Sequence, residues 1–188
     1  MVSFRRQSFY LGTLMSILVL NSFATAQDNS VRKEAPWIKY SSPEGGYSAL
    51  LPSQPTLDTE QWSRAEPKTY TALSVVSWPP GIIQIRYFDL SPNQSLSLDD
   101  LRAGEIKRLA DKGTLVSDKS ISLDGYPGRQ LVVLDKSESS AEVTISRVYK
   151  VGQRAYTISF ELGGADESYA LKSGGTKFFD SFQITRKP

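Results

Sequence analysis

Few residue types in this chain are suited to chemistry, because its 188 residues include no histidine and no cysteine. Their absence excludes Ser-His-Asp and Cys-His catalysis, His-ligated zinc and disulfide bonds. The sequence also lacks the GxSxG, P-loop and GxGxxG motifs. We therefore expect a protein that is not an enzyme, with no catalytic residues, no metal and no cofactor.

Two short patterns resemble catalytic ones without the context that catalysis needs. Ser30 and Lys33 have Ser-x-x-Lys spacing, but they fall in a polar segment that cannot hold a nucleophile in place. Asp99 and Asp100 are adjacent at a predicted helix start, where acidic side chains favour the helix dipole and diverge from each other. Carboxylates from different strands could still meet in a cleft, as glycoside hydrolysis requires. A hydrolase that uses carboxylates without histidine therefore remains an alternative.

Arg147 is the first candidate binding residue, since it is the one charge on an otherwise apolar strand face. A cation held among aromatic side chains could meet an acidic ligand or partner. The structural alternative is an internal role, in which Arg147 pairs with Asp89 or Asp180 or stacks on a neighbouring tyrosine. Some partner is required, because a buried unpaired charge would cost several kcal/mol.

Two stiff loops supply the other candidate binding residues, namely Trp78, Pro79 and Pro80 in the first and Tyr126 and Arg129 in the second. Rigid aromatic and arginine side chains make good interface anchors, because they lose little entropy when they are fixed. The same aromatics could instead fold back onto the core. These residues are predicted to bind a protein partner.

The N-terminal residues predict export. Arg5 and Arg6 precede an uncharged apolar run, and residues 24–26 (ATA) fit a cleavage site for a signal peptide. We expect a signal peptide at 1–26, a flexible tether at 27–36 and one domain at 37–188; an uncleaved N-terminal anchor is the alternative. The domain would reside in the periplasm or outside the cell, or in the thylakoid lumen of a photosynthetic source.

Removal of the signal peptide also changes the charge. The whole chain has 22 basic and 20 acidic residues, and loss of Arg5 and Arg6 leaves the mature chain with no net charge. A neutral chain without a basic run has no electrostatic surface for nucleic acid. We expect no nucleic-acid partner, no transmembrane span after cleavage, and a monomer.

The strongest predicted element is an antiparallel hairpin at 142–162 that turns at Gly152 and Gln153, with Gly first as a type II′ turn requires. This turn pairs Tyr149 with Tyr156 and places the apolar side chains on one face, so we expect a half-buried hairpin. A helix is predicted between Ser97, its N-cap, and Gly113. Further strands are predicted at 37–40, 47–51, 57–62, 69–78, 82–90, 114–116, 121–123 and 129–135.

The C-terminal part is predicted to contain a helix that Asp166 caps and that Gly174 and Gly175 interrupt. An edge strand at 181–185 would follow. The pattern as a whole indicates an α+β domain in which an antiparallel sheet is flanked by helices, as an α/β/α sandwich.

The order of these elements resembles the PsbP-like domain family. The matching segments are 47–52 (YSALLP), 123–129 (LDGYPGR), 147–149 (RVY), the strand around Tyr156, and 178–182 (FFDSF). The resemblance spans roughly 37–186 and implies a PsbP-like fold, non-catalytic partner binding and, in some members, a role as an extrinsic subunit of photosystem II.

Together these observations predict a non-enzymatic exported binding or accessory module, such as an extrinsic subunit of a membrane complex. Two alternatives remain: the hydrolase described above, and a carrier for a small apolar ligand in a pocket between sheet and helix.

Overall fold

The computed structural model describes residues 36–61, 69–77, 81–90, 93, 95–135, 141–164 and 166–185, with the backbone alone for 58–61 and 69–77. Ala35–Pro188 form one compact unit. The predicted signal peptide, nearly all of the tether, and the candidate residues Trp78, Pro79 and Pro80 lie outside the described residues. No helix within the described ranges has the length and apolar character to span a bilayer.

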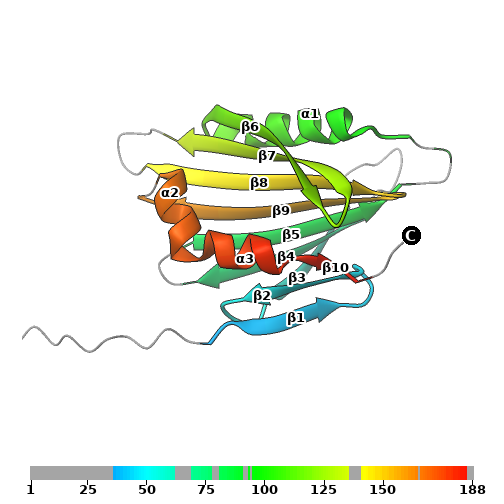
Figure 1. Cartoon of the computed structure of the whole chain (residues 1–188), viewed down its shortest axis with the longest axis horizontal. Coiled ribbons are helices and arrows are strands. Elements are labelled where there is room, and N and C mark those ends of the chain that lie inside the picture. Colours follow the sequence, from blue (N-terminus) through cyan, green and yellow to red (C-terminus); the bar gives the residue numbers. More distant parts are fainter. Residues whose placement is uncertain are drawn as a thin grey trace, which may run out of the picture. The chain divides into compact units, whose positions relative to one another are not determined.

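A seven-stranded antiparallel sheet forms the centre of this unit (Figure 1), with the strand order β3-β4-β5-β9-β8-β7-β6. Its strands are β3 (Thr56–Gln61), β4 (Thr69–Ser77), β5 (Gly81–Asp89), β6 (Thr114–Leu123), β7 (Tyr126–Asp135), β8 (Glu142–Val151) and β9 (Arg154–Gly163). The predicted class, an α+β domain with an antiparallel sheet flanked by helices, is confirmed.

The first two strands and the last form a separate sheet with the order β1-β2-β10. These strands are β1 (Ile38–Ser42), β2 (Tyr47–Leu51) and β10 (Gln183–Ile184). The predicted closing edge strand is therefore confirmed. It pairs with β2 from the opposite end of the chain, a contact that local sequence patterns do not encode.

The β8–β9 hairpin has the predicted register. Tyr149 lies opposite Tyr156, and Arg147 lies opposite Ile158. Gly152 has φ 59°, the left-handed value that this turn requires and that glycine adopts without steric cost.

Helix α1 (Leu98–Leu109) begins and ends where predicted. The Ser97 side chain accepts a hydrogen bond from the Asp100 amide, and the Asp100 carboxylate accepts one from the Ser97 amide, which together form a capping box. The last turn tightens into a 3-10 segment, η1 (Ala110–Lys112), and Gly113 follows with φ 145°.

The C-terminal helical stretch is interrupted as predicted. Asp166 caps α2 (Glu167–Ala170), and a wide turn, η2 (Leu171–Gly175), contains Gly174 with a non-helical φ of 133°. Helix α3 (Thr176–Ser181) continues from it and contacts β2, while α2 contacts β8 and β9.

The predicted short strands at 114–116 and 121–123 are parts of one continuous strand, β6, so their separation was wrong. The pairing register of β6 with β7 shifts between Leu115 and Ser117. This bulge disrupts the alternation of side chains, which is why the sequence looked interrupted.

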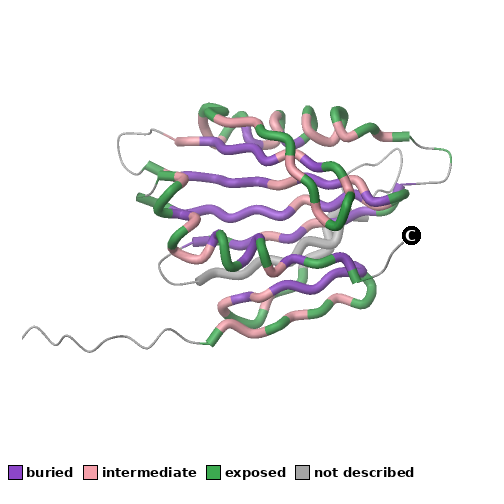
Figure 2. Tube along the Cα trace, in the orientation of Figure 1, coloured by how far each residue is buried: buried purple, intermediate pink, exposed green. Residues whose placement is uncertain are grey.

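Both faces of the central strands are buried (Figure 2), so the prediction of a half-buried hairpin was wrong. One face is apolar and packs under α3 and the small sheet, with Tyr47, Tyr156 and Phe182 in mutual ring contact. The other face contacts α1 and buries polar side chains, among them Thr144, Ser146, Ser159 and Glu161.

Candidate functional site

The sequence-predicted binding residues that can be located do not converge. Arg129 points to the α1 side of the sheet, whereas Tyr126 and Arg147 belong to the opposite, apolar face. Tyr126 is half-buried and packs against the main core. Arg129 donates to Asp118 Oδ1 at 2.8 and 2.5 Å and to Ser120 Oγ at 2.7 Å.

Arg147 has an internal role, and its partners include Tyr149, one of the two tyrosines expected: the guanidinium hydrogen-bonds this side chain and opposes the rise in its pKa that burial causes. Its guanidinium carbon lies 4.3 Å from the ring centre of Phe179, and its Nε donates to Gln130 Oε1 at 2.8 Å. Asp89 instead accepts hydrogen bonds from Arg154. Phe179 comes from α3, which covers this face of the sheet, so the stacking partner depends on the packing of layers and could not be read from strand register.

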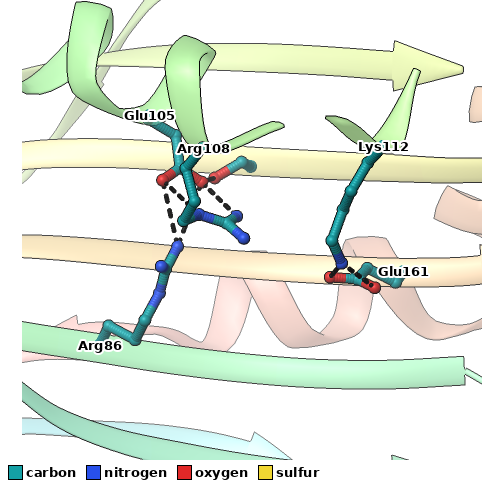
Figure 3. A network of polar contacts seen from close by, with 6 residues as sticks. Arg86, Glu105, Arg108, Lys112 and Glu161 are labelled. Carbon is teal, nitrogen blue, oxygen red and sulfur yellow. Dashed lines mark hydrogen bonds and ion pairs between the residues drawn. The ribbon is translucent and has the colours of Figure 1, made fainter. Parts of the chain in front are cut away.

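A buried charge network that sequence reasoning missed lies between α1 and the sheet (Figure 3). The Glu105 carboxylate on α1, with its side chain 5% exposed, is its centre. Arg86 Nη2 on β5 donates to both carboxylate oxygens at 3.2 and 3.1 Å. Arg108 Nε and Nη2 donate at 2.8 and 2.6 Å, and Ser146 Oγ on β8 donates at 2.6 Å.

A second ion pair lies at the end of the same helix (Figure 3). Lys112 Nζ donates to both oxygens of Glu161 on β9, at 2.6 and 2.7 Å. Glu161 is buried, and this pair provides it with a cation. Glu161 also interacts electrostatically with Arg86 and Arg108, so this pair and the Glu105 network belong to one charged cluster of three cations and two carboxylates.

Burial by itself raises the pKa of Glu105, but the hydrogen bonds from Arg108 and the charges of Arg86 and Arg108 outweigh it. The pKa of this carboxyl is therefore lowered from its ordinary value of 4.5. A general acid for glycoside hydrolysis needs a raised pKa. Glu105 is thus held as an ionised acceptor and is poorly suited to donate a proton.

A groove of about 550 Å³ lies beside this network, lined by parts of α1, β5 and β9. The apolar part of its lining consists of Phe88, Leu96 and Leu101, and the charged network contributes Arg86, Glu105 and Arg108. The volume is in the range of small-molecule sites, about 300–1,000 Å³. The groove therefore combines an apolar wall with a charged one.

Gly104 keeps the groove open on the α1 side. A Cβ added to Gly104 would meet no atom within 4 Å, so close packing does not explain the glycine. In a helix interior glycine costs about 1 kcal/mol relative to alanine. The missing side chain therefore has a stability cost, and its visible effect is space at the groove.

One polar atom in the groove wall has no hydrogen-bond partner. Arg86 Nε is buried and unpaired among the described residues, although the same guanidinium donates to Glu105 through Nη2. A buried donor without an acceptor costs about 1–3 kcal/mol. Buried donors without a partner are uncommon in folded proteins.

Helical spacing could have indicated this site. Leu101, Glu105, Arg108 and Lys112 follow one another at steps of four, three and four, which places all of them on the face of α1 that contacts the sheet. Glu105 thus occupies a position where the apolar stripe requires a hydrophobic residue. The partner Arg86 is on another element and has no such signal.

No group of acidic side chains suited to a metal ion occurs among the described residues. The two buried carboxylates of the α1 side, Glu105 and Glu161, are already saturated by cations. The network therefore holds its carboxylates ionised and presents the N–H donors of its cations, an arrangement suited to binding a ligand.

No family model matches the chain, and no curated protein matches it either. Among solved structures, a Bacteroides thetaiotaomicron protein aligns with 79% of this chain at 15% identity and a TM-score of 0.47. The chain spans about half the length of that protein, 48%. A Pseudomonas aeruginosa protein of unknown function, PA94, aligns with 74% of this chain and 89% of its own at 10% identity and a TM-score of 0.41. Neither likeness is close enough to bear on function.

Proposed function

We propose that this protein is a non-enzymatic exported binding module that holds its ligand or partner in the groove beside α1. The observation that carries this proposal is the groove itself, with an apolar wall, a charged wall and a glycine that leaves it open. The fixed ionisation of Glu105 supports binding over acid–base chemistry.

The proposal of export rests on the N-terminal sequence, and the accessory role rests on the resemblance to the PsbP-like family. An accessory subunit of a membrane complex would present the groove to its partner from the periplasm or the thylakoid lumen. The loop of Tyr126 is a weaker candidate for that contact, because this side chain packs against the core.

The experiment compares the wild-type mature chain with Gly104→Phe. The phenylalanine is expected to fill the groove. We expect the variant to fold, because a Cβ at position 104 would meet no atom within 4 Å. Each protein is immobilised and exposed to an envelope extract of the producing cells, and retained proteins and small molecules are identified by mass spectrometry.

Components that the wild type retains and Gly104→Phe loses would support the proposal. An identical retained set on both proteins would move the binding site away from the groove. Hydrolysis of a panel of chromogenic glycosides and esters that disappears in Glu105→Gln would contradict a non-enzymatic role.

A further inference from the structure

The inner wall of the groove has an excess of positive charge. Arg86 and Arg108 share the carboxylate of Glu105, and their side chains are only 17% and 18% exposed. Both arginines also interact electrostatically with the carboxylate of Glu161, which pairs with Lys112. The other charged lining residues, Asp100, Lys107 and Asp111, are exposed at the rim, where solvent and salt screen them. The three cations Arg86, Arg108 and Lys112 therefore face two carboxylates, Glu105 and Glu161, which leaves about one unbalanced positive charge.

The apolar wall is a small cluster of its own, separate from the main core. Leu96 and Leu101 pack against buried Phe88, Leu90 and Ala155. Leu101 and Phe88 line the groove together with Arg86 and Arg108. A ligand in the groove would therefore touch hydrocarbon along one side and guanidinium groups along the other.

We propose that the groove binds a small amphiphilic monocarboxylate, that is, an apolar chain that ends in one carboxylate. The carboxylate would lie against Arg86 and Arg108 and balance their excess charge, because guanidinium and carboxylate match in geometry and charge. The chain would lie on Phe88, Leu96 and Leu101. This inference rests on the proposed binding function and names its ligand class.

The excess positive charge and the apolar wall together favour an amphiphilic monocarboxylate over a neutral alcohol, a cationic amphiphile or a short carboxylate. A neutral alcohol of the same length would bury the same apolar surface and leave the arginines unbalanced. A cationic amphiphile would meet the wrong sign of charge, and a short carboxylate such as acetate would leave the apolar wall without contact.

The test is calorimetric titration of the mature chain with decanoate, decan-1-ol and acetate. We expect decanoate to bind roughly tenfold more tightly than decanol, the difference that one or two charge-assisted hydrogen bonds supply. Acetate should give no measurable heat of binding. Equal affinity for decanoate and decanol, or no binding of decanoate, would overturn the inference.

Three variants locate the site. Gly104→Phe should abolish decanoate binding by filling the groove, and Arg108→Gln should reduce its affinity roughly to that of decanol. Arg129→Gln is the matched control: Arg129 and Arg102 also share one carboxylate, Asp118, on the same side of the sheet, but neither lines the groove. Unchanged binding in Gly104→Phe, or equal losses in Arg108→Gln and Arg129→Gln, would overturn the inference.

Urea denaturation of each variant shows whether a loss of binding reflects unfolding. The outcome is also separable from that of the proposed function. Suppose that the wild type retains components of the envelope extract that Gly104→Phe does not retain, and that the wild type gives no heat of binding with decanoate. The groove then binds a ligand of another class.

Discussion

Glu105 is the residue on which the polar side of the sheet depends. Three groups from three elements, Arg86, Arg108 and Ser146, donate to its carboxylate. A buried ion pair of this kind contributes modestly as a whole, but removal of one partner leaves the others uncompensated. Glu105 is the shared acceptor, so its loss affects both arginines.

We predict that Glu105→Gln lowers the free energy of unfolding by about 3–5 kcal/mol, because two arginines then remain half-paired in the protein interior. Urea denaturation at neutral pH measures the change. Asp99→Asn, which alters an exposed acid in the first turn of the same helix, should cost less than about 1 kcal/mol. A similar loss in both variants would mean that the network is not coupled to folding.

The same residue predicts a pH dependence. Since the pKa of Glu105 is lower in the folded protein than its ordinary value of 4.5, its contribution to stability is fully present above that value. The contribution is lost as the pH falls through the lowered folded pKa. The stability difference between wild type and Glu105→Gln should therefore shrink progressively over the acidic range below pH 4.5. A difference that stays constant over that range would contradict the lowered pKa.

At the scale of elements, local rules predicted much of the fold. The hairpin register follows from Gly152 and alternating side chains, and the bounds of α1 follow from Ser97 and Gly113. The bulge in β6 was missed, because a single residue that shifts the register removes the alternation on which strand prediction depends.

The site was harder to predict than the fold, for a physical reason. Arg86, Glu105 and Ser146 are brought together only when α1 packs on β7 and β8, within reach of the Arg86 side chain from β5. Sequence patterns show which residues share a face of one element, and they do not show which two elements meet. The position of Glu105 on the apolar stripe of α1 was the one local feature of the sequence that indicated this site.

Two glycines at α1 should respond to alanine with opposite signs. Gly104→Ala should stabilise the protein by about 1 kcal/mol, since the helix gains propensity and the methyl group meets no atom. Gly113→Ala should destabilise it by at least about 1–2 kcal/mol. At φ 145° a side chain is strained, and the new Cβ would lie 2.6 Å from the carbonyl carbon of Leu134.

Thermal or urea denaturation of both variants provides the check, and each variant serves as the control for the other. A destabilised Gly104→Ala would show that the space beside α1 is filled. Tolerance of Gly113→Ala would show that the turn after η1 can relax.

At the scale of the whole domain, the two faces of the large sheet have different compositions. The apolar face, with Tyr156, Ile158 and Phe160, packs under the small sheet and α3 and provides most of the buried core. The polar face is covered by α1 and contains the charge network and the groove. The main core and the proposed binding groove thus lie on opposite sides of the same strands.

The N-terminal sequence makes a prediction for the whole chain. After export, the mature protein should begin at Gln27, and the mass of the purified protein should lack residues 1–26. Intact-mass measurement of protein recovered from the exported fraction tests this. Recovery of the full-length mass there would indicate an uncleaved anchor.

Hydrogen exchange of the backbone amides tests the location of the binding site most directly. Exchange is measured for the mature chain with and without the fraction that it retains from the envelope extract, whatever the chemical class of that fraction. We expect slower exchange in α1 and β5, the elements that supply most of the groove lining. Protection confined to β1, β2, β10 and α3, or no protection at all, would contradict a binding site beside α1.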